Sequence, residues 1–143
     1  MDTFNENREF FLTILITNEN FKQMNYSEKA KDIQEKLSIG KLMDAFEQYY
    51  HEDVVMIEAN GERREGKTVN REAEKKFLAS VQEWHGAGVI AIASNEEEGI
   101  TMVESWMDVT YQGGMRMKAE QIARQKWQGD QIIEERFYYN VPG

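Results

Sequence analysis

Two acidic residues in the strand-forming part of the chain could carry out proton transfer. Glu58 ends a short apolar run, and Asp108 lies in a longer one. Alternation along a strand puts Glu104, Trp106 and Asp108 on one face. Two carboxyl groups in one apolar pocket raise each other's pKa, so that one can stay protonated while the other accepts a proton. Such a pair would move a proton on or off a small organic molecule.

The last third of the chain has the pattern of a long β-hairpin, in which two strand-like runs flank a Gly129-Asp130 turn. From Met115 to Trp127 the odd positions are mostly apolar and the even positions mostly charged. This alternation predicts one sheltered face and one wet face. The sheltered face carries Gln121 and Gln125, whose amides need polar partners. They would find such partners in a ligand cavity more easily than in a packed core.

Three helices are expected ahead of most of the strands that position these side chains. Apolar residues at helical spacing predict helices at residues 28–38, 41–50 and 69–81. Ser27 is expected to cap the first helix, and either Thr68 or Asn70 the third.

The strands begin with a short hairpin, for which Asn60-Gly61 predicts a type I′ turn. Four long strands follow from Trp84 onward. The order of helix, helix, hairpin, helix and meander predicts an α+β fold, with the helices gathered on one face of a curved antiparallel sheet.

Residues 1–26 are predicted to form a separate N-terminal extension, with the domain proper at 27–143. The extension contains a β-prone run at 10–16. Met24 would also serve as a start, which leaves open whether the segment before it is dispensable.

Composition excludes several classes of function. A chain of 143 residues with 41% apolar content builds one domain with one core. The net charge of −9 disfavours a nucleic-acid partner, and no run is long enough to span a membrane. The absence of cysteine excludes thiolate chemistry and fits the cytoplasm. The two histidines show no metal-binding spacing, so neither a metal nor another cofactor is expected.

Three segments together resemble the SnoaL-like branch of the nuclear-transport-factor-2-like superfamily. They are YYHEDVVMIEANGERREGK (49–67), the predicted helix at 69–81 and WQGDQIIEERFYYN (127–140). The resemblance covers residues 27–140 and makes 27–143 a SnoaL-like domain. It implies a cone-shaped fold with an internal cavity and, commonly, a homodimer through the outer face of the sheet. The fold hosts isomerases, epoxide hydrolases, cyclases and binding proteins, so it does not fix a reaction.

The known catalytic sets of this superfamily are incomplete here. In the ketosteroid-isomerase branch the general base falls at Glu58, but the acid that completes the oxyanion hole falls at Ala123. In the limonene-epoxide-hydrolase branch an Asp falls at Asp108, but the Arg two residues before it falls at Trp106 and the second Asp at Phe137. Neither reaction can be transferred as it stands.

The resemblance nevertheless implies that Asp108 and Glu58 face one cavity, and these are the predicted catalytic residues. The predicted ligand-binding residues are Met56, Trp106, Gln121, Gln125, Phe137 and Tyr139. The alternative is that one acid turns to solvent at a bulge, or forms an ordinary ion pair with Arg116, Arg124 or Arg136.

Two functions stay open. The first is a small-molecule-binding protein without catalysis, and the second is a cofactor-independent isomerase, cyclase or hydrolase that uses the two acids. The incomplete catalytic sets favour the binding protein. A lesser option is an interaction module that recruits a partner through the N-terminal extension.

The orientation that turns Asp108 inward also predicts a homodimer interface. It places an apolar row on the outer face of the sheet, too large to stay exposed to water. The row consists of Val103, Ser105, Met107, Val109 and Tyr111, beside Ile122 on the next strand.

Overall fold

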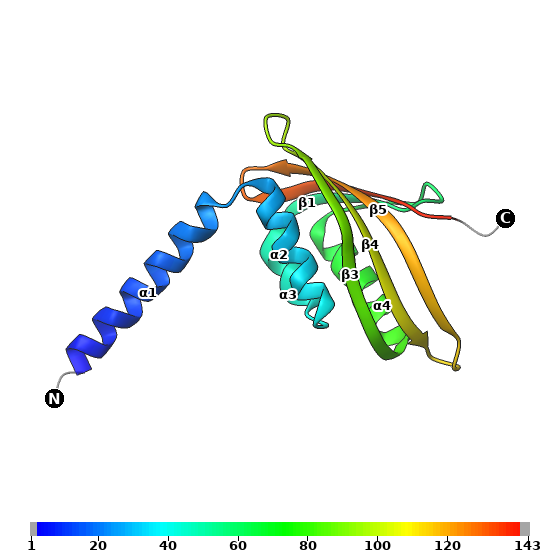
Figure 1. Cartoon of the computed structure of the whole chain (residues 1–143), viewed down its shortest axis with the longest axis horizontal. Helices are drawn as coiled ribbons and strands as arrows, with labels where there is room; N and C mark the ends of the chain where they lie inside the picture. The colour runs from blue at the N-terminus through cyan, green and yellow to red at the C-terminus, as the bar shows by residue number, and fades with distance from the viewer. Residues whose placement is uncertain (1–2, 141–143) are drawn as a thin grey trace.

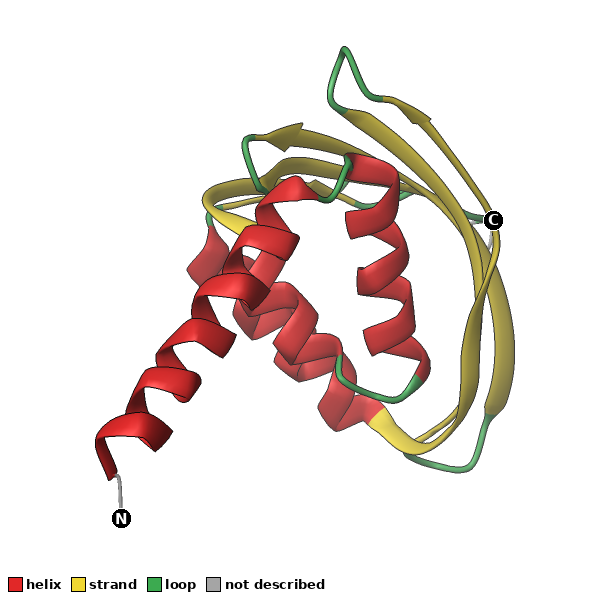
Figure 2. Ribbon diagram, turned by 60° about the vertical axis from the view of Figure 1, so that its left-hand side comes forward, coloured by secondary structure: helices red, strands yellow, loops and turns green. Residues whose placement is uncertain are grey.

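The computed structural model describes residues 3–140, which form helices and one six-stranded sheet (Figure 1). The helices are α1 (Thr3–Gln23), α2 (Tyr26–Ser38), α3 (Leu42–Tyr49) and α4 (Lys67–Ser80). The strands are β1 (Tyr50–Ile57), β2 (Arg63–Glu65), β3 (Val81–Asn95), β4 (Ile100–Tyr111), β5 (Arg116–Gln128) and β6 (Gln131–Tyr138). Figure 2 shows the sheet curving around the helices. The predicted α+β class, with a curved sheet around three helices, is confirmed.

The sheet has the order β2-β1-β6-β5-β4-β3. All pairs are antiparallel except β1 and β6, which run parallel, with Val55 beside Glu134. The expectation of an entirely antiparallel sheet is wrong at this pair. Hairpin pairings follow from local turns, but β1 and β6 are joined by most of the chain, so their relative direction is set by tertiary packing.

A turn in the chain separates β1 from β2 at the expected place but not with the expected geometry. A type I′ turn needs positive φ at both central residues, and among the described residues only glycines have it. Gly61 has φ 89°, and its N–H donates to the Glu58 carbonyl oxygen at 2.9 Å. Asn60 therefore contributes its side chain instead, which accepts a hydrogen bond from the Glu62 N–H at 2.9 Å.

Helix α2 is capped from two directions. The Asn25 side chain accepts a hydrogen bond from the Glu28 N–H at 2.8 Å, so Asn25 is the N-cap rather than the predicted Ser27. Glu96, in the acidic loop between β3 and β4, accepts from the N–H groups of Tyr26 and Ser27 at 2.7 and 3.2 Å. A distant carboxylate thus satisfies N–H groups that the first turn leaves open.

The start of α4 is anchored by Asn70, although not as a helix cap. The N-cap position is Gly66, with φ 94° and no side-chain capping bond, so the predicted cap at Thr68 or Asn70 is wrong. Asn70 is fully buried, and its amide donates to the carbonyl oxygens of Arg64 at 3.1 Å and Gly66 at 2.8 Å. This side chain ties α4 to the β1–β2 hairpin.

Strands β4 and β5 pair so that their odd-numbered residues share the concave face. Val103 lies opposite Ala123 and Ser105 opposite Gln121, and Val103 and Ala123 are buried. The predicted alternation of β5 is therefore confirmed. The predicted orientation of β4 is wrong, because its odd positions face inward. Side chains alternate with period two, so the wrong choice of face inverts every residue of the strand.

The hydrophobic core lies where α2 and α3 meet β1, β5 and β6. Tyr49 and Ile132 are fully buried there, and Ile33 and Trp127 are nearly so. The Trp127 ring meets Tyr49 edge-on at a centroid distance of 6.0 Å. Ile33, Phe46 and Tyr50 of this core also form part of the wall of a cavity.

The N-terminal segment is helical, so the expectation of a strand at 10–16 is wrong. An isolated strand leaves its backbone hydrogen-bonding groups unpaired, whereas a helix satisfies most of them within itself. Figure 1 shows α1 extending away from the cone, and Phe10, Phe11 and Leu15 are more than half exposed. No helix in the described part of the chain is long and apolar enough to cross a membrane. The division at residue 26 stays a prediction, and residues 141–143 of the predicted domain lie outside the described range.

Candidate functional site

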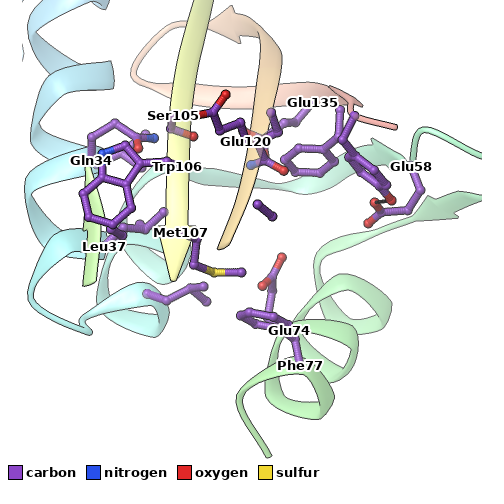
Figure 3. A pocket seen from close by; sticks show the side chains of 18 of the residues that line it. Gln34, Leu37, Glu58, Glu74, Phe77, Ser105, Trp106, Met107, Glu120 and Glu135 are labelled. Carbon is purple, nitrogen blue, oxygen red and sulfur yellow. Dashed lines mark hydrogen bonds between the residues drawn. The ribbon is translucent and has the colours of Figure 1, made fainter. Parts of the chain in front are cut away.

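A cavity of about 950 Å³ lies between the concave face of the sheet and helices α2, α3 and α4 (Figure 3). Its walls are largely aromatic and aliphatic. The aromatic residues that border it are Phe46, Tyr50, Phe77, Trp84, Trp106, Tyr111, Phe137 and Tyr139. Four carboxyl-bearing residues, Glu58, Glu74, Glu120 and Glu135, also border this space. The combination of apolar walls with a few polar groups is typical of a small-molecule site.

Glu135 is the most enclosed of these acids, with 3% of the residue exposed. Tyr50 Oη donates to Glu135 Oε1 at 2.6 Å, and Gln125 Nε2 donates to Glu135 Oε2 at 2.7 Å. Behind them, Thr101 Oγ1 donates to Gln125 Oε1 at 2.8 Å and accepts from Trp127 Nε1 at 3.0 Å. Burial raises the pKa of Glu135 to about 7 despite the two hydrogen bonds that favour its charged form. The network fixes the position of this carboxyl group, which can gain or lose a proton near neutral pH.

Glu74 approaches the cavity from α4 (Figure 3). Among the described residues its carboxyl group has no hydrogen-bond partner. Burial raises the pKa of Glu74 to about 7, the negative charges of Glu135 and Glu58 add to this, and Arg64 opposes it. Glu74 is thus a second acid that can change its charge near neutral pH, and its oxygens remain available to a ligand.

Glu58 lies at the mouth of the cavity and is already paired. Arg64 Nη2 donates to Glu58 Oε1 at 2.7 Å, and Tyr139 Oη donates to Glu58 Oε2 at 2.7 Å. Burial and the bond to Glu58 raise the pKa of Tyr139. Both carboxylate oxygens are therefore occupied by donors, which holds Glu58 in place but leaves it less free to act as a base.

Asp108 lies on the face of β4 opposite the cavity. It pairs across the strands with Lys118 and is not among the described residues that border the cavity. Arg116 binds it in a bidentate ion pair, with Nε to Oδ1 at 3.0 Å and Nη2 to Oδ2 at 2.9 Å. This pair lowers the pKa of Asp108. The expectation that Asp108 and Glu58 share one cavity is wrong, and the ion-pair alternative describes Asp108. A catalytic role for Asp108 stays a prediction that its position does not support.

Trp106 borders the cavity, but strand alternation directs its side chain to the same outer face as Asp108. Lys118 Nζ lies 4.8 Å from the centre of its ring. On β3 the ring lies against Gly88, where an added Cβ would come within 2.6 Å of Trp106 Nε1. The glycine at this position leaves the room that the indole occupies.

The other predicted ligand-binding residues are divided between cavity and core. Gln121, Gln125, Phe137 and Tyr139 border the cavity. Met56 is 1% exposed in the hydrophobic core and is not one of the bordering residues in the described part of the chain. Whether any of them binds a ligand stays a prediction.

Sequence reasoning missed Glu74, Glu135 and Arg64. Glu74 precedes Phe77 by three residues on a predicted helix, which puts the two on one side of it. Glu135 lies opposite Gln125 in the hairpin and provides the acceptor that the Gln125 amide requires. Within the described residues no group of three or more potential metal ligands converges.

Comparison with known proteins supports the fold and identifies the family. Among solved structures, a candidate SnoaL-like polyketide cyclase from Mesorhizobium loti is similar to this chain. The two share 28% identity over 81% of this chain and 100% of that one, with a TM-score of 0.68. A candidate isomerase from Bacillus subtilis shares 18% identity over 82% and 90% of the two chains, with a TM-score of 0.70.

A candidate polyketide cyclase from Pseudomonas putida shares 18% identity over 82% and 93%, with a TM-score of 0.69. A comparison with curated proteins gave no match. The model of the SnoaL-like domain matches residues 13–139, nearly the whole chain, and the resemblance drawn from the sequence is thereby confirmed. This protein belongs to the SnoaL-like domain family.

Proposed function

We propose that this protein binds a small organic molecule in the cavity between its sheet and its helices. The observation that carries the proposal is the fixed Glu135 carboxyl group, held by Tyr50 and Gln125 at the edge of open space. Burying a carboxyl group in an apolar interior costs desolvation free energy. Contact with a ligand at a binding site would offset this cost. The volume of about 950 Å³ lies at the upper end of the range for ligand pockets.

Filling the cavity tests this proposal. Met107 borders the cavity from β4, so Met107→Trp should occupy part of its volume and abolish binding. Met115, which is 59% exposed, provides a matched control because Met115→Trp adds the same bulk outside the cavity. Ligand that co-purifies with the protein would be identified by mass spectrometry, and binding measured by NMR with a panel of small organic compounds. Equal binding by both variants would contradict the proposal.

A cofactor-independent isomerase, cyclase or hydrolase is the second candidate. The specific observation in its favour is that both Glu74 and Glu135 have a pKa raised to about 7, as a general acid or base requires. The candidate polyketide cyclase that is 28% identical to this chain supports the same class of chemistry.

Deuterium exchange would detect such proton transfer. A bound ligand with an acidic C–H bond should gain deuterium in D₂O in the presence of the protein. Glu135→Gln should stop the gain while leaving the ligand bound. Absence of exchange by the unchanged protein would leave binding as the function.

We also propose a homodimer formed through the convex face of the sheet. The predicted interface row, Val103 to Tyr111 in odd steps, lies on the concave face instead, but Ile122 does lie on the outer face. It sits there between Glu104 of β4 and Tyr138 of β6, and Ile122 and Tyr138 are both over 40% exposed. Charges of both signs surround these residues, as a self-complementary twofold interface requires. The absence of cysteine supports the cytoplasm as the compartment.

A further inference from the structure

The charges around the cavity do not balance. Glu58, Glu74, Glu120 and Glu135 border it, together with Arg64 and Lys118. Strand alternation on β5 directs the side chains of Glu120 and Lys118 to the outer face. Among the described residues this leaves Arg64 as the basic side chain that acts on Glu74 between Glu58 and Glu135. Arg64 is already committed, because it donates to Glu58 at 2.7 Å and to Asn70 Oδ1 at 3.1 Å. Two carboxyl groups are therefore left without a cation.

Glu74 and Glu135 differ in how completely their oxygens are used. Both oxygens of Glu135 accept hydrogen bonds, from Tyr50 and Gln125. Glu74 has no such partner in the described part of the chain and extends into the space that Glu58 and Glu135 border from the sheet (Figure 3). An unpartnered carboxyl group that extends into a largely apolar cavity points to a polar atom supplied by a ligand.

The remaining walls suit a cation with an apolar body. Phe77 lies one turn after Glu74 on α4, and both border the cavity, as do Leu37 and Met107. Aromatic faces attract an ammonium group, and more strongly where water is excluded. An ammonium ion beside a desolvated carboxylate gains more than it would in water.

Resting on the proposed function, we infer that the ligand is an organic amine whose ammonium group binds Glu74 beside Glu135 and whose apolar part fills the cavity. Without it, the two acids avoid the cost of an unbalanced buried charge by holding protons near neutral pH, as their raised pKa values show. A bound ammonium ion takes the place of the proton on Glu74.

Three compounds of one shape test the charge preference: phenylbutylamine, phenylbutanol and phenylbutanoate. Binding would be measured by calorimetry and NMR at about pH 7.5, where both acids are largely ionised. The amine should bind at least about tenfold more tightly than the alcohol, and the carboxylate more weakly than either. Binding should weaken for the amine alone towards about pH 5.5, since Glu74, facing Glu58, Arg64 and Glu135, then holds its proton.

Two variants on α4 separate the local charge from the net charge. Glu74→Gln should weaken amine binding by about tenfold and leave alcohol binding within about twofold. Glu72→Gln removes the same charge from the exposed side of the helix and should change neither. Equal affinities for amine and alcohol, or equal effects of the two variants, would overturn the inference.

Failure of the inference can be told apart from failure of the proposed function. Alcohol or carboxylate binding that is at least as tight as amine binding, and that Met107→Trp abolishes, would keep the cavity as a ligand site and remove the amine. No binding of the amine at about 5 mM would also remove it. Binding of all three that survives Met107→Trp would refute both.

Discussion

Tyr50 and Glu135, which are 85 residues apart in sequence, are joined by a hydrogen bond of 2.6 Å from Tyr50 Oη to Glu135 Oε1. Both residues are buried, and each belongs to one of the two strands that run parallel. The bond therefore links the end of α3, where β1 begins, to the last strand of the sheet. The same hydrogen bond therefore holds the Glu135 carboxyl group at the cavity and joins β1 to β6.

The pH dependence of stability should reveal the buried acid. In the folded chain Glu135 holds its proton up to about pH 7, whereas in the unfolded chain it ionises near its ordinary pKa of 4.5. Its contribution is therefore fully present below pH 4.5 and is lost as pH rises through 7. The shift corresponds to a loss of about 3 kcal/mol in the free energy of unfolding.

Urea denaturation at about pH 5 and pH 8 would measure this loss. Glu135→Gln should remove the part of the decrease in the free energy of unfolding between about pH 5 and pH 8 that Glu135 causes. The part that remains is due to Glu74, whose pKa is raised in the same way. Exposed Glu97→Gln changes the net charge equally and should leave the whole decrease intact. Asp32 and Glu47, whose pKa values are lowered, act only in more acidic solution. An unchanged decrease in Glu135→Gln would contradict the assignment.

Asn70→Ala should destabilise the protein through the join between α4 and the β1–β2 hairpin. The substitution removes a side-chain donor from three carbonyl oxygens, those of Val54, Arg64 and Gly66, and one acceptor from Arg64. We expect a loss of about 2–4 kcal/mol in thermal or urea unfolding. Thr68→Ala, at an exposed position two residues earlier, should cost under about 0.5 kcal/mol. Similar losses in both variants would show that the hydrogen bonds of Asn70 do not anchor α4.

Gly88→Ala should disturb the outer face of the sheet by displacing the Trp106 indole. The new Cβ would lie 2.6 Å from Trp106 Nε1, which is too close for the ring to stay in place. We expect a loss of about 1–3 kcal/mol and a shifted tryptophan fluorescence. Gly86→Ala, where the nearest ring atom is 3.3 Å away, should cost less. Equal losses of stability in Gly88→Ala and Gly86→Ala would show that the close contact with Trp106 is not the reason for a glycine at position 88.

Ile122→Glu should dissociate the proposed homodimer. It buries a new carboxylate beside Glu104 at the centre of the convex face, where like charges repel. Light scattering at micromolar concentration should then give the mass of one chain, with an unchanged circular dichroism spectrum. Lys126→Glu, near the end of β5 and closer to the loops, should leave the assembly intact. A monomer mass for the unsubstituted protein would refute the proposed homodimer.

The sequence by itself determined the class of fold and the inward face of β5. Helical spacing located α2, α3 and α4 to within a few residues, and alternation put Gln121 and Gln125 on the sheltered side. These features are local, because one residue's neighbours in sequence are also its neighbours on a helix or strand.

Only the tertiary structure decided which carboxyl groups meet at the cavity. On β4 the apolar residues Val103, Met107 and Val109 already favoured the odd face, but alignment to catalytic relatives turned Asp108 inward. The strand's own pattern was the better guide, because burial of apolar area outweighs a family correspondence when the matching catalytic set is incomplete.

A bulge in the last hairpin settled the identity of the buried acid. Counted from the tight turn alone, Gln125 would face Glu134, but a register shift between Lys126 and Trp127 moves it opposite Glu135. Glu134 then pairs with Arg124 on the outer face. One extra residue in one strand thus decides which of two adjacent glutamates, Glu134 or Glu135, faces the interior and which faces outward. Such a bulge arises from how the sheet curves over the helices, which no local pattern records.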